Sequence, residues 1–392
     1  GGVGAVHFDE KFGPDYFLPT DAYLETCAAV GAGFFSQRMN ELTGDAKYMD
    51  ELERTLYNNV LTGISLSGTQ YTYQNPLNSA KHARWGWHDC PCCPPMFLKM
   101  MSAMPGFIYS QKGDDIYVNL FIGSETELSL SDQSRIRLTQ KTGYPWDGSV
   151  VMTVEPEKEK TFLLKVRIPG WAQGVENPYD LYRSEVKSAV NLKVNGKSIA
   201  MKIFKGYAEI QRKWKKGDRV ELTLPVQPRL VTANEAVADL QNKVAIAAGP
   251  FVYCLEGCDN EGVADLRLDT RAPLSMTFEK ELLNGVNVIK GQALDKTGKK
   301  VSVSAIPYYA LGNRQDKGDS HARLALLRVT FVNTPDQRCC KQDDIDHYSG
   351  VERHSQSVDK QQFEPAAYFH DTRHNAVEHG CHEHHGTEKG KQ

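Results

Sequence analysis

The sequence predicts an α+β multidomain protein in which a helical part precedes two β-sandwich domains. Apolar residues recur at helical spacing in the first part of the chain. From about residue 115 apolar and polar residues alternate, and a second strand-rich block covers roughly 226–335. We therefore expect domains at 1–107, 108–225 and 226–335, followed by a polar, disordered tail at 336–392.

The first two helices are predicted from their caps and from apolar spacing. Thr20 or Asp21 can cap a helix that runs to about Leu42, where Thr43-Gly44 ends it. Asp45 can cap a second helix that ends at Gly63. That helix carries a stripe at spacings of three and four, which predicts ordinary core: Met49, Leu52, Leu56 and Val60.

A proline-rich segment separates these helices from the next one. Residues 64–80 are predicted to be extended. Residues 81–95 are predicted to be loop, because Pro91, Pro94 and Pro95 remove backbone donors and fix dihedral angles. A short helix is expected from about Met96 to Met104, since prolines suit a helix start.

The two β-sandwich domains are predicted from short alternating runs. Turn signals such as Asn195-Gly196 separate these runs, and many short strands with such turns are typical of a sandwich. The predicted strands are 116–122, 161–168, 190–195, 207–210 and 220–224 in the first block, and 243–248, 251–254, 301–306 and 324–332 in the second.

Composition excludes several classes of function. The 392 residues are 40% hydrophobic and 24% charged, with a net charge of −3, so no basic field attracts nucleic acid or an anionic membrane. No stretch approaches the ~20 apolar residues of a membrane span. The chain opens with Gly1-Gly2-Val3-Gly4, so we expect it to begin inside a domain, which leaves the compartment open.

Cysteines are concentrated near the start, in Glu25-Thr-Cys27 and Cys90-Pro-Cys92-Cys93-Pro-Pro. Structural zinc sites are normally closed by four thiolate, imidazole or carboxylate ligands. Glu25, Cys27, Cys92 and Cys93 make four, which predicts a Zn²⁺ site. Two alternatives stay open, namely buried thiols and a vicinal disulfide between Cys92 and Cys93. Cys90 is predicted to be a spectator thiol.

The spacing of this group is atypical for zinc fingers or ribbons. Residues two apart on a regular helix point to nearly opposite sides. Glu25 and Cys27 can therefore share one ion only if the first turn is irregular or the Glu25 arm bends back. His88 is predicted to be a plain loop histidine rather than a ligand, and Cys381-His382-Glu383-His384-His385 in the tail to bind metal at most adventitiously.

Several motifs in this order resemble glycoside hydrolase family 127, which includes β-L-arabinofuranosidases. The Glu-x-Cys and Cys-x-Cys-Cys-Pro-Pro runs are the most specific. The β-rich remainder is similar to two β-sandwich domains of that family. The matching motifs are Gly1-Gly2-Val3-Gly4 with Glu10-Lys-Phe12, Tyr23-Leu-Glu25-Thr-Cys27, Glu53-Arg-Thr-Leu-Tyr57-Asn58, Tyr73-Gln-Asn75-Pro76 and Cys90-Pro-Cys92-Cys93-Pro94-Pro95.

The resemblance implies a retaining hydrolase with an unusual nucleophile. Cys92, as a zinc-bound thiolate, is expected to attack the anomeric carbon, and Glu10 to act as acid and then base. Glu25, Cys27, Cys92 and Cys93 are expected to hold zinc. Glu53 and Tyr73 match family positions near the sugar, although a surface carboxylate and a packed aromatic are the plainer interpretations. The implied substrate is a glycan that carries terminal β-L-arabinofuranose or a related plant sugar.

The resemblance also implies that the helical part is the C-terminal fragment of an (α/α)6 barrel. We expect such a fragment to expose apolar helix surface and to be a weak catalyst alone. A homodimer through the β-sandwich domains is a further expectation. The alternatives are a non-catalytic carbohydrate-binding or structural zinc protein, and a thiol-alkyl transferase, for which no donor-binding motif is found.

Overall fold

A computed structural model describes residues 13–20, 22–79, 84–86, 91–185, 188–314, 323–324 and 327–329. The chain divides into two compact units, Gly1–Val332 and Asn333–Gln392, and the described residues all belong to the first. The predicted acid/base Glu10, His88, Cys90 and the polar tail at 336–392 lie outside the described residues.

The first helix, α1 (Thr26–Thr43), begins later than the predicted cap at residues 20–21. The chain just before it is extended, because the Thr26 amide donates to the Tyr73 carbonyl at 2.9 Å and Glu25 forms a β-bridge with Gln74. The predicted end is confirmed, since Gly44 caps the helix in the left-handed region.

The second helix, α2 (Ala46–Thr55), begins where the sequence predicts. The Asp45 side chain accepts a hydrogen bond from the Lys47 amide at 3.0 Å, so Asp45 is the N-cap. The helix then widens into a π-helical turn, η1 (Leu56–Val60). The predicted stripe is confirmed as core, since its four residues, Met49, Leu52, Leu56 and Val60, are all buried.

The third helix, α3 (Cys93–Ala103), begins earlier than the predicted Met96, and a one-turn helix, η2 (Met104–Phe107), follows it. The prediction of loop up to residue 95 is therefore wrong at its end. The first turn of a helix needs no amide donors, so Pro94 and Pro95 fit inside it. Some apolar helix surface is exposed to solvent. The exposed fractions are 62% for Phe35, 80% for Leu42 and 62% for Leu98.

The middle of the chain forms two sheets that enclose one large apolar core. The strands at residues 149–156 and 160–167 largely alternate buried and more exposed residues, as expected where one face packs inward. One sheet has the order β10-β9-β13-β6-β5-β4 and the other β11-β12-β7-β3-β2. The strands are β2 (Tyr109–Lys112), β3 (Asp115–Val118), β4 (Ser124–Ser129), β5 (Arg135–Thr142), β6 (Ser149–Pro156), β7 (Lys160–Arg167), β9 (Asn191–Val194), β10 (Lys197–Ser198), β11 (Ile203–Phe204), β12 (Tyr207–Trp214) and β13 (Asp218–Thr223).

The C-terminal part of the described chain forms a third sheet. Its central strands close on themselves, because β16 pairs with both β20 and β15 while β17 pairs with both β19 and β22. A second apolar core fills this ring. The strands are β1 (Asn78–Ser79), β8 (Tyr182–Ser184), β14 (Arg229–Ala233), β15 (Lys243–Ala248), β16 (Phe251–Glu256), β17 (Arg267–Leu268), β18 (Ser275–Glu279), β19 (Val286–Leu294), β20 (Lys300–Pro307), β21 (Arg323–Leu324) and β22 (Leu327–Val329).

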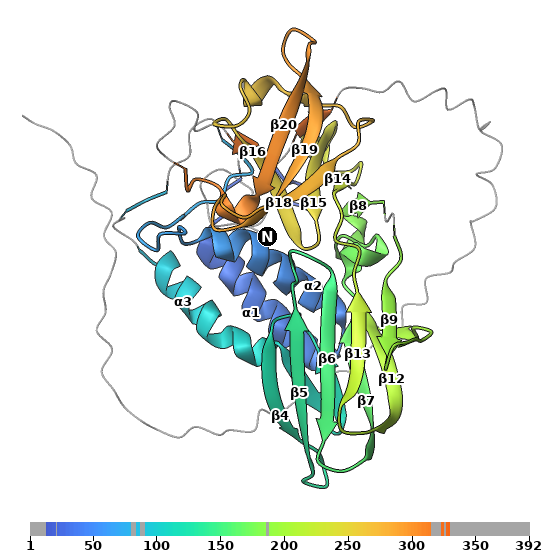
Figure 1. Cartoon of the computed structure of the whole chain (residues 1–392). Helices are drawn as coiled ribbons and strands as arrows, with labels where there is room; N and C mark the ends of the chain where they lie inside the picture. The colour runs from blue at the N-terminus through green and yellow to red at the C-terminus, as the bar shows by residue number, and fades with distance from the viewer. Residues whose placement is uncertain are drawn as a thin grey trace, which may run out of the picture. The chain divides into compact units, whose positions relative to one another are not determined.

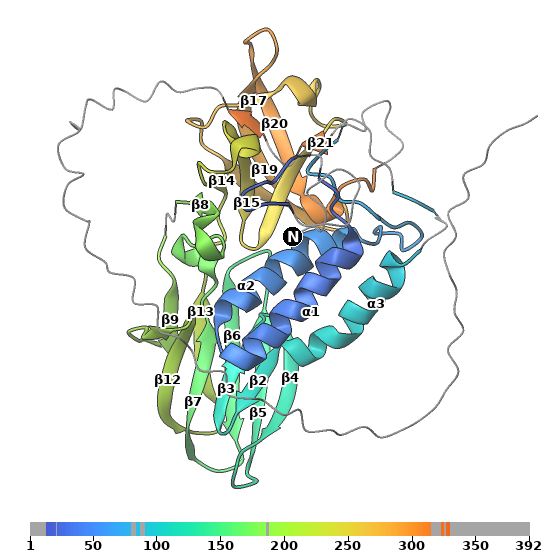
Figure 2. The same cartoon turned by 180° about the vertical axis from the view of Figure 1, so that it is seen from behind.

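The helices lie beside both β-rich regions, as Figures 1 and 2 show from opposite sides. Buried polar contacts join them: the Asn58 side chain in η1 donates to the Pro250 carbonyl at 2.9 Å and accepts from the Val252 amide at 2.7 Å. A helical part followed by two β-rich domains is the architecture that the sequence predicts. None of the helices in the described part of the chain has the length and hydrophobicity that a membrane crossing needs.

Candidate metal centre

Four side chains from two distant parts of the chain meet at the helix starts. Glu25 directly precedes α1 and Cys27 lies in its first turn, while Cys92 and Cys93 lie at the start of α3. One ligand atom from each lies within 4.8 Å of all the others. The predicted difficulty with Glu25 and Cys27 does not arise, because Glu25 has an extended backbone and stands outside the helix.

The distances within this group fit a tetrahedral ion. Ligands at about 2.3 Å for sulfur and 2.1 Å for oxygen lie roughly 3.6–3.8 Å apart around such an ion. The Cys27 Sγ lies 3.2 Å from the Cys92 Sγ and 3.4 Å from the Cys93 Sγ. Glu25 Oε1 lies 3.4 Å from the Cys92 Sγ and 4.0 Å from the Cys93 Sγ. The group could therefore hold a metal ion.

The thiols are free, which excludes the vicinal disulfide in this structure. The Cys92 and Cys93 sulfurs lie 3.9 Å apart, far beyond the ~2.05 Å of a disulfide bond. Cys93 is fully buried, whereas Cys27 and Cys92 are half-buried. Cys92 therefore belongs to the group and is also partly exposed to solvent.

Burial makes this group a poor place for uncompensated negative charge. Burial, with hydrogen bonds to Cys92 and Cys93, raises the pKa of the Cys27 thiol far above its usual range. Burial together with the charges of Cys92 and Glu25 raises the pKa of Cys93 to about 12. A divalent cation would reverse this effect, because a metal-bound thiol loses its proton. The donor set and its surroundings thus suit a cation.

Two tyrosines surround the group. The Tyr23 hydroxyl donates to Glu25 Oε2 at 2.9 Å, which leaves Oε1 facing the cysteines. The Tyr73 hydroxyl is hydrogen-bonded to Tyr23 and Cys92, and burial with these neighbours and the Glu25 charge raises the pKa of Tyr73. Tyr73 therefore stays a neutral donor beside the Cys92 sulfur. Its predicted role at a sugar site stays a prediction.

Glu53 lies apart from these contacts, in an ion-pair network between α2 and β7. Its carboxylate pairs with both terminal nitrogens of Arg167, one of them at 3.2 Å, and its side chain is 1% exposed. Arg167 also donates to Asp50 at 2.6 Å and is itself fully buried. The surface-carboxylate interpretation of Glu53 is therefore wrong. Its predicted contact with the sugar stays a prediction.

Sequence reasoning gave no role to Tyr23, Arg84 or Trp85. Tyr23 stands two residues before Glu25, inside a motif that was noticed only for its acid and its thiol. Trp85 stacks on Tyr73, with ring centroids 5.4 Å apart and planes 19° apart. Its neighbour Arg84 is a buried charge in a segment with no periodic pattern. Only the contacts themselves reveal these three residues.

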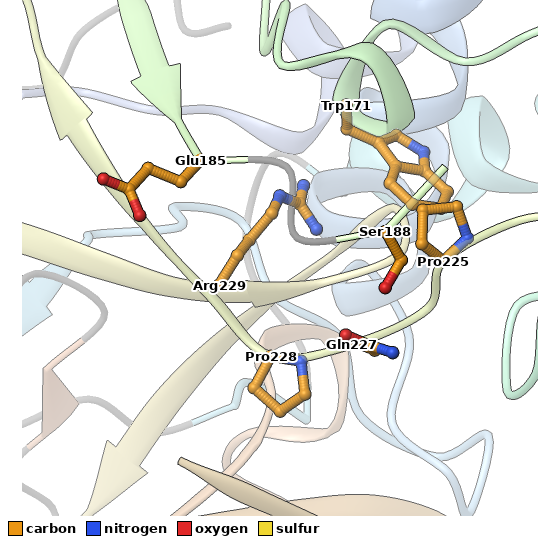
Figure 3. A pocket seen from close by; sticks show the side chains of 7 residues that line it. All are labelled: Trp171, Glu185, Ser188, Pro225, Gln227, Pro228 and Arg229. Atoms are coloured by element: carbon orange, nitrogen blue, oxygen red, sulfur yellow. The ribbon is translucent and has the colours of Figure 1, made fainter. Parts of the chain in front are cut away.

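A cavity lined by none of these residues lies between the middle region and β14 (Figure 3). Its volume of about 20 Å³ suits one water molecule rather than a sugar. The indole nitrogen of Trp171, one of the lining residues, is buried and has no hydrogen-bond partner among the described residues. The lining residues are Trp171, Glu185, Ser188, Pro225, Gln227, Pro228 and Arg229.

Comparison with protein families gives three consecutive matches. Residues 1–106 match the β-L-arabinofuranosidase GH127 catalytic domain, and residues 115–226 match the GH127 middle domain. Residues 228–320 match the C-terminal domain of glycoside hydrolase family 127. The helical part and both β-rich regions thus match successive domains of one family.

Individual relatives agree with these matches. A non-reducing end β-L-arabinofuranosidase of Bifidobacterium longum is 30% identical over 356 residues, which cover 80% of this chain and 51% of that protein. A GH127 β-arabinofuranosidase structure is 39% identical with a TM-score of 0.78, over 84% of this chain and 53% of the other. A GH127 β-L-arabinofuranosidase structure from Geobacillus stearothermophilus T6 is 36% identical with a TM-score of 0.76, over 84% and 54%. The chain therefore spans about half the length of these relatives.

Proposed function

Because the chain belongs to glycoside hydrolase family 127, we propose that its cysteine group is the centre of a retaining glycoside hydrolase. The proposed reaction releases terminal β-L-arabinofuranose, or a related plant-glycan sugar, from a glycan. The main support is the meeting of Glu25, Cys27, Cys92 and Cys93 within 4.8 Å. A homologous β-L-arabinofuranosidase supports the substrate class.

Glu25, Cys27, Cys92 and Cys93 would hold the metal. We propose that it is Zn²⁺, because zinc binds thiolates well and also accepts a carboxylate in a four-coordinate site. When bound, the ion would keep the Cys92 sulfur ionised at neutral pH. Cys92 is favoured over Cys93 as the reacting residue because Cys93 is fully buried. Tyr73 would orient the Cys92 sulfur through its hydroxyl.

Covalent catalysis follows from an ionised thiol beside a sugar. The Cys92 sulfur would attack the anomeric carbon, so that a carbon–sulfur bond forms while the bond to the leaving oxygen breaks. Glu10 would give its proton to that oxygen, and would then take a proton from the water that displaces the sulfur. Two successive inversions give net retention of configuration. Glu53 is kept as a proposed substrate contact.

A non-catalytic carbohydrate-binding protein with a structural zinc is the second candidate. A closed set of four protein ligands is typical of structural zinc sites, whereas catalytic sites usually keep a position open. In the hydrolase Cys92 would react with the sugar once the metal is bound, whereas in the second candidate it would only hold the metal.

The substitution Cys92→Ser separates the two candidates. We expect the variant of this 392-residue chain to retain at least part of its zinc and to lose the weak hydrolysis of an aryl β-L-arabinofuranoside that we expect of the wild-type chain. Cys254→Ser, which changes a buried cysteine of β16 outside the cysteine group, is the matched control and should keep wild-type turnover.

Two outcomes would overturn the hydrolase proposal. In one, Cys92→Ser turns over as fast as the wild-type chain. In the other, the turnover of Cys92→Ser falls only in proportion to the zinc that the variant loses, which would leave Cys92 a purely metal-binding role.

A further inference from the structure

Arg84 is a buried arginine whose hydrogen bonds reach across two parts of the chain. It is 4% exposed. On one side it donates to the Leu311 carbonyl at 3.0 and 3.2 Å and to the Tyr309 carbonyl at 3.2 Å, both at the one-turn helix η7 (Tyr308–Ala310) after β20. On the other side it donates to the Thr62 carbonyl at 2.6 Å and to the Thr72 hydroxyl at 3.2 Å. The C-terminal β-rich region and the segment 62–72 are thus joined through one side chain.

The residue next to Arg84 contacts the aromatic wall of the metal centre. Trp85 and Tyr71 exchange two backbone hydrogen bonds, at 2.9 and 2.8 Å, and their rings meet edge to face. The Trp85 ring also stacks on Tyr73, whose hydroxyl is hydrogen-bonded to Cys92. A shift of the Arg84 backbone would therefore move Trp85, and Trp85 would move Tyr73.

The segment 72–74, which Arg84 contacts at Thr72, also bonds to the residues at the start of α1. The Thr72 carbonyl accepts from the Thr26 hydroxyl at 2.7 Å, and the Tyr73 carbonyl accepts from the Thr26 amide at 2.9 Å. Glu25 itself forms a β-bridge with Gln74. The position of Glu25 therefore depends on residues 72–74, which Arg84 contacts at Thr72.

We propose that Arg84 is a positioning residue through which the C-terminal β-rich region holds Tyr73 and Glu25 in place at the cysteine group. Its effect on metal binding needs only the metal centre, whereas its effect on turnover rests on the proposed hydrolase function.

An arginine suits this task for a chemical reason. The acceptors are three backbone carbonyls and one hydroxyl, which lie on opposite sides of one planar group. A guanidinium has five donors in a fixed plane and can satisfy them together, whereas an ammonium donates from a single atom. Lysine would keep the charge at this position but would satisfy only part of this set.

The test measures binding of Co²⁺ to the full chain, because cobalt gives a sulfur-to-metal absorption band that reports its ligands. We expect Arg84→Ala to weaken Co²⁺ binding at least tenfold and to change that band, as loss of support behind a ligand does. Arg84→Lys should lie between Arg84→Ala and the wild-type chain. Methylguanidinium should restore much of the binding to Arg84→Ala.

Arg229→Ala is the matched control, since Arg229 is also buried but pairs with Glu176 and the Gly249 carbonyl. It should lower the melting temperature yet bind Co²⁺ within twofold of wild type, without a response to methylguanidinium. Circular dichroism shows whether each variant is folded. If Arg84→Ala does not fold, the Co²⁺ affinity of Arg84→Lys decides the test.

Wild-type Co²⁺ affinity and an unchanged band in a folded Arg84 variant would overturn the inference. So would equal weakening by Arg229→Ala, because Arg84 would then act only through general stability. Neither result depends on hydrolysis. Failure of the proposed function would be seen separately, as a wild-type chain that binds Co²⁺ but has no turnover.

Discussion

At the scale of single residues, the hydroxyl of Tyr23 decides how Glu25 faces the cysteines. It donates to Oε2 at 2.9 Å, so that Oε1 is the oxygen nearest the Cys92 sulfur. Groups that hold a metal ligand from behind typically change metal affinity by about 10–100-fold when they are removed. Tyr23 is therefore part of the metal centre although it offers no ligand of its own.

The substitution Tyr23→Phe tests this role. We expect zinc affinity, measured by competition with a chelator, to fall about tenfold while the fold is kept. Tyr48→Phe, on α2, is the control and should bind zinc like the wild-type chain. Equal affinity in all three proteins would show that Tyr23 does not orient Glu25.

The four proposed ligands could be identified from the sequence, whereas their geometry could not. Thiolates and one carboxylate at this density pointed to a metal, but helical spacing placed Glu25 and Cys27 on opposite sides. The structure removes that obstacle through a long-range contact, the bridge between Glu25 and Gln74, which delays the helix start. Contacts between residues far apart in the chain leave no local pattern, so Arg84 and Trp85 were missed for the same reason, whereas the Tyr23 contact with Glu25 is local and was overlooked within its motif.

At the scale of elements, buried ion pairs fasten helices to strands. Arg167 in β7 is fully buried and lies between Asp50 and Glu53 of α2. Removing one partner of such a network leaves buried charge without compensation, which typically costs about 3–5 kcal/mol.

Arg167→Met should therefore lower the free energy of unfolding by about 3–5 kcal/mol in urea denaturation. Arg183→Met, which loses an exposed pair with Asp180, should cost at most about 1 kcal/mol. A small effect of Arg167→Met, comparable to that of Arg183→Met, would contradict this view of the contact between α2 and β7.

The buried ion pair of Glu176 and Arg229 predicts that the stability of the fold depends on pH. Burial raises the pKa of Glu176, but hydrogen bonds and the charge of Arg229 outweigh it and hold this pKa below its usual range. The folded chain thus binds this proton less readily than the unfolded chain. The pair therefore stabilises the fold above the ordinary glutamate pKa, and its contribution is lost as the pH falls through the lowered value.

The variant Glu176→Gln should be less stable than the wild-type chain near pH 7. The difference in the free energy of unfolding should shrink as the pH falls from about 6 to below about 4, because the wild-type carboxylate then becomes protonated. Glu185→Gln serves as a control with an exposed carboxylate and should show little difference at any pH. A constant gap between Glu176→Gln and wild type across this range would contradict the prediction.

Some boundaries of the helices were predicted correctly and others were not. Local chemistry fixed the caps at Gly44 and Asp45, and both predictions are confirmed. The π-helical turn η1 was not predicted, and neither were the bonds of its Asn58 side chain to Pro250 and Val252 of the C-terminal region, because contacts across such a distance leave no local pattern. The early start of α3 was missed because Pro94 and Pro95 were placed just before the first turn rather than inside it.

At the scale of the whole molecule, the candidate metal centre joins parts of the chain that are far apart in sequence. Its proposed ligands come from the starts of α1 and α3, and Arg84 connects the neighbouring segment to the C-terminal region. The order of a helical part and two β-rich domains was predictable from periodicity. The boundaries near 107 and 225 and the homodimer stay predictions.

Zinc should therefore stabilise the described unit as a whole. A ligand that binds only the folded state at a hundredfold excess over its Kd adds about 2.7 kcal/mol. We expect a chelator to lower the melting temperature of the wild-type chain, and zinc to restore it. Cys93→Ser should respond less to either treatment, and an identical response would mean that the stabilising ion binds elsewhere.

The most direct test of the central claim is zinc K-edge X-ray absorption of the chain loaded with one equivalent of Zn²⁺. We predict three sulfur neighbours at about 2.3 Å and one oxygen neighbour at about 2.0–2.2 Å. A spectrum with only nitrogen and oxygen neighbours, as a histidine-bearing segment would give, would contradict the assignment of Glu25, Cys27, Cys92 and Cys93 as the ligands.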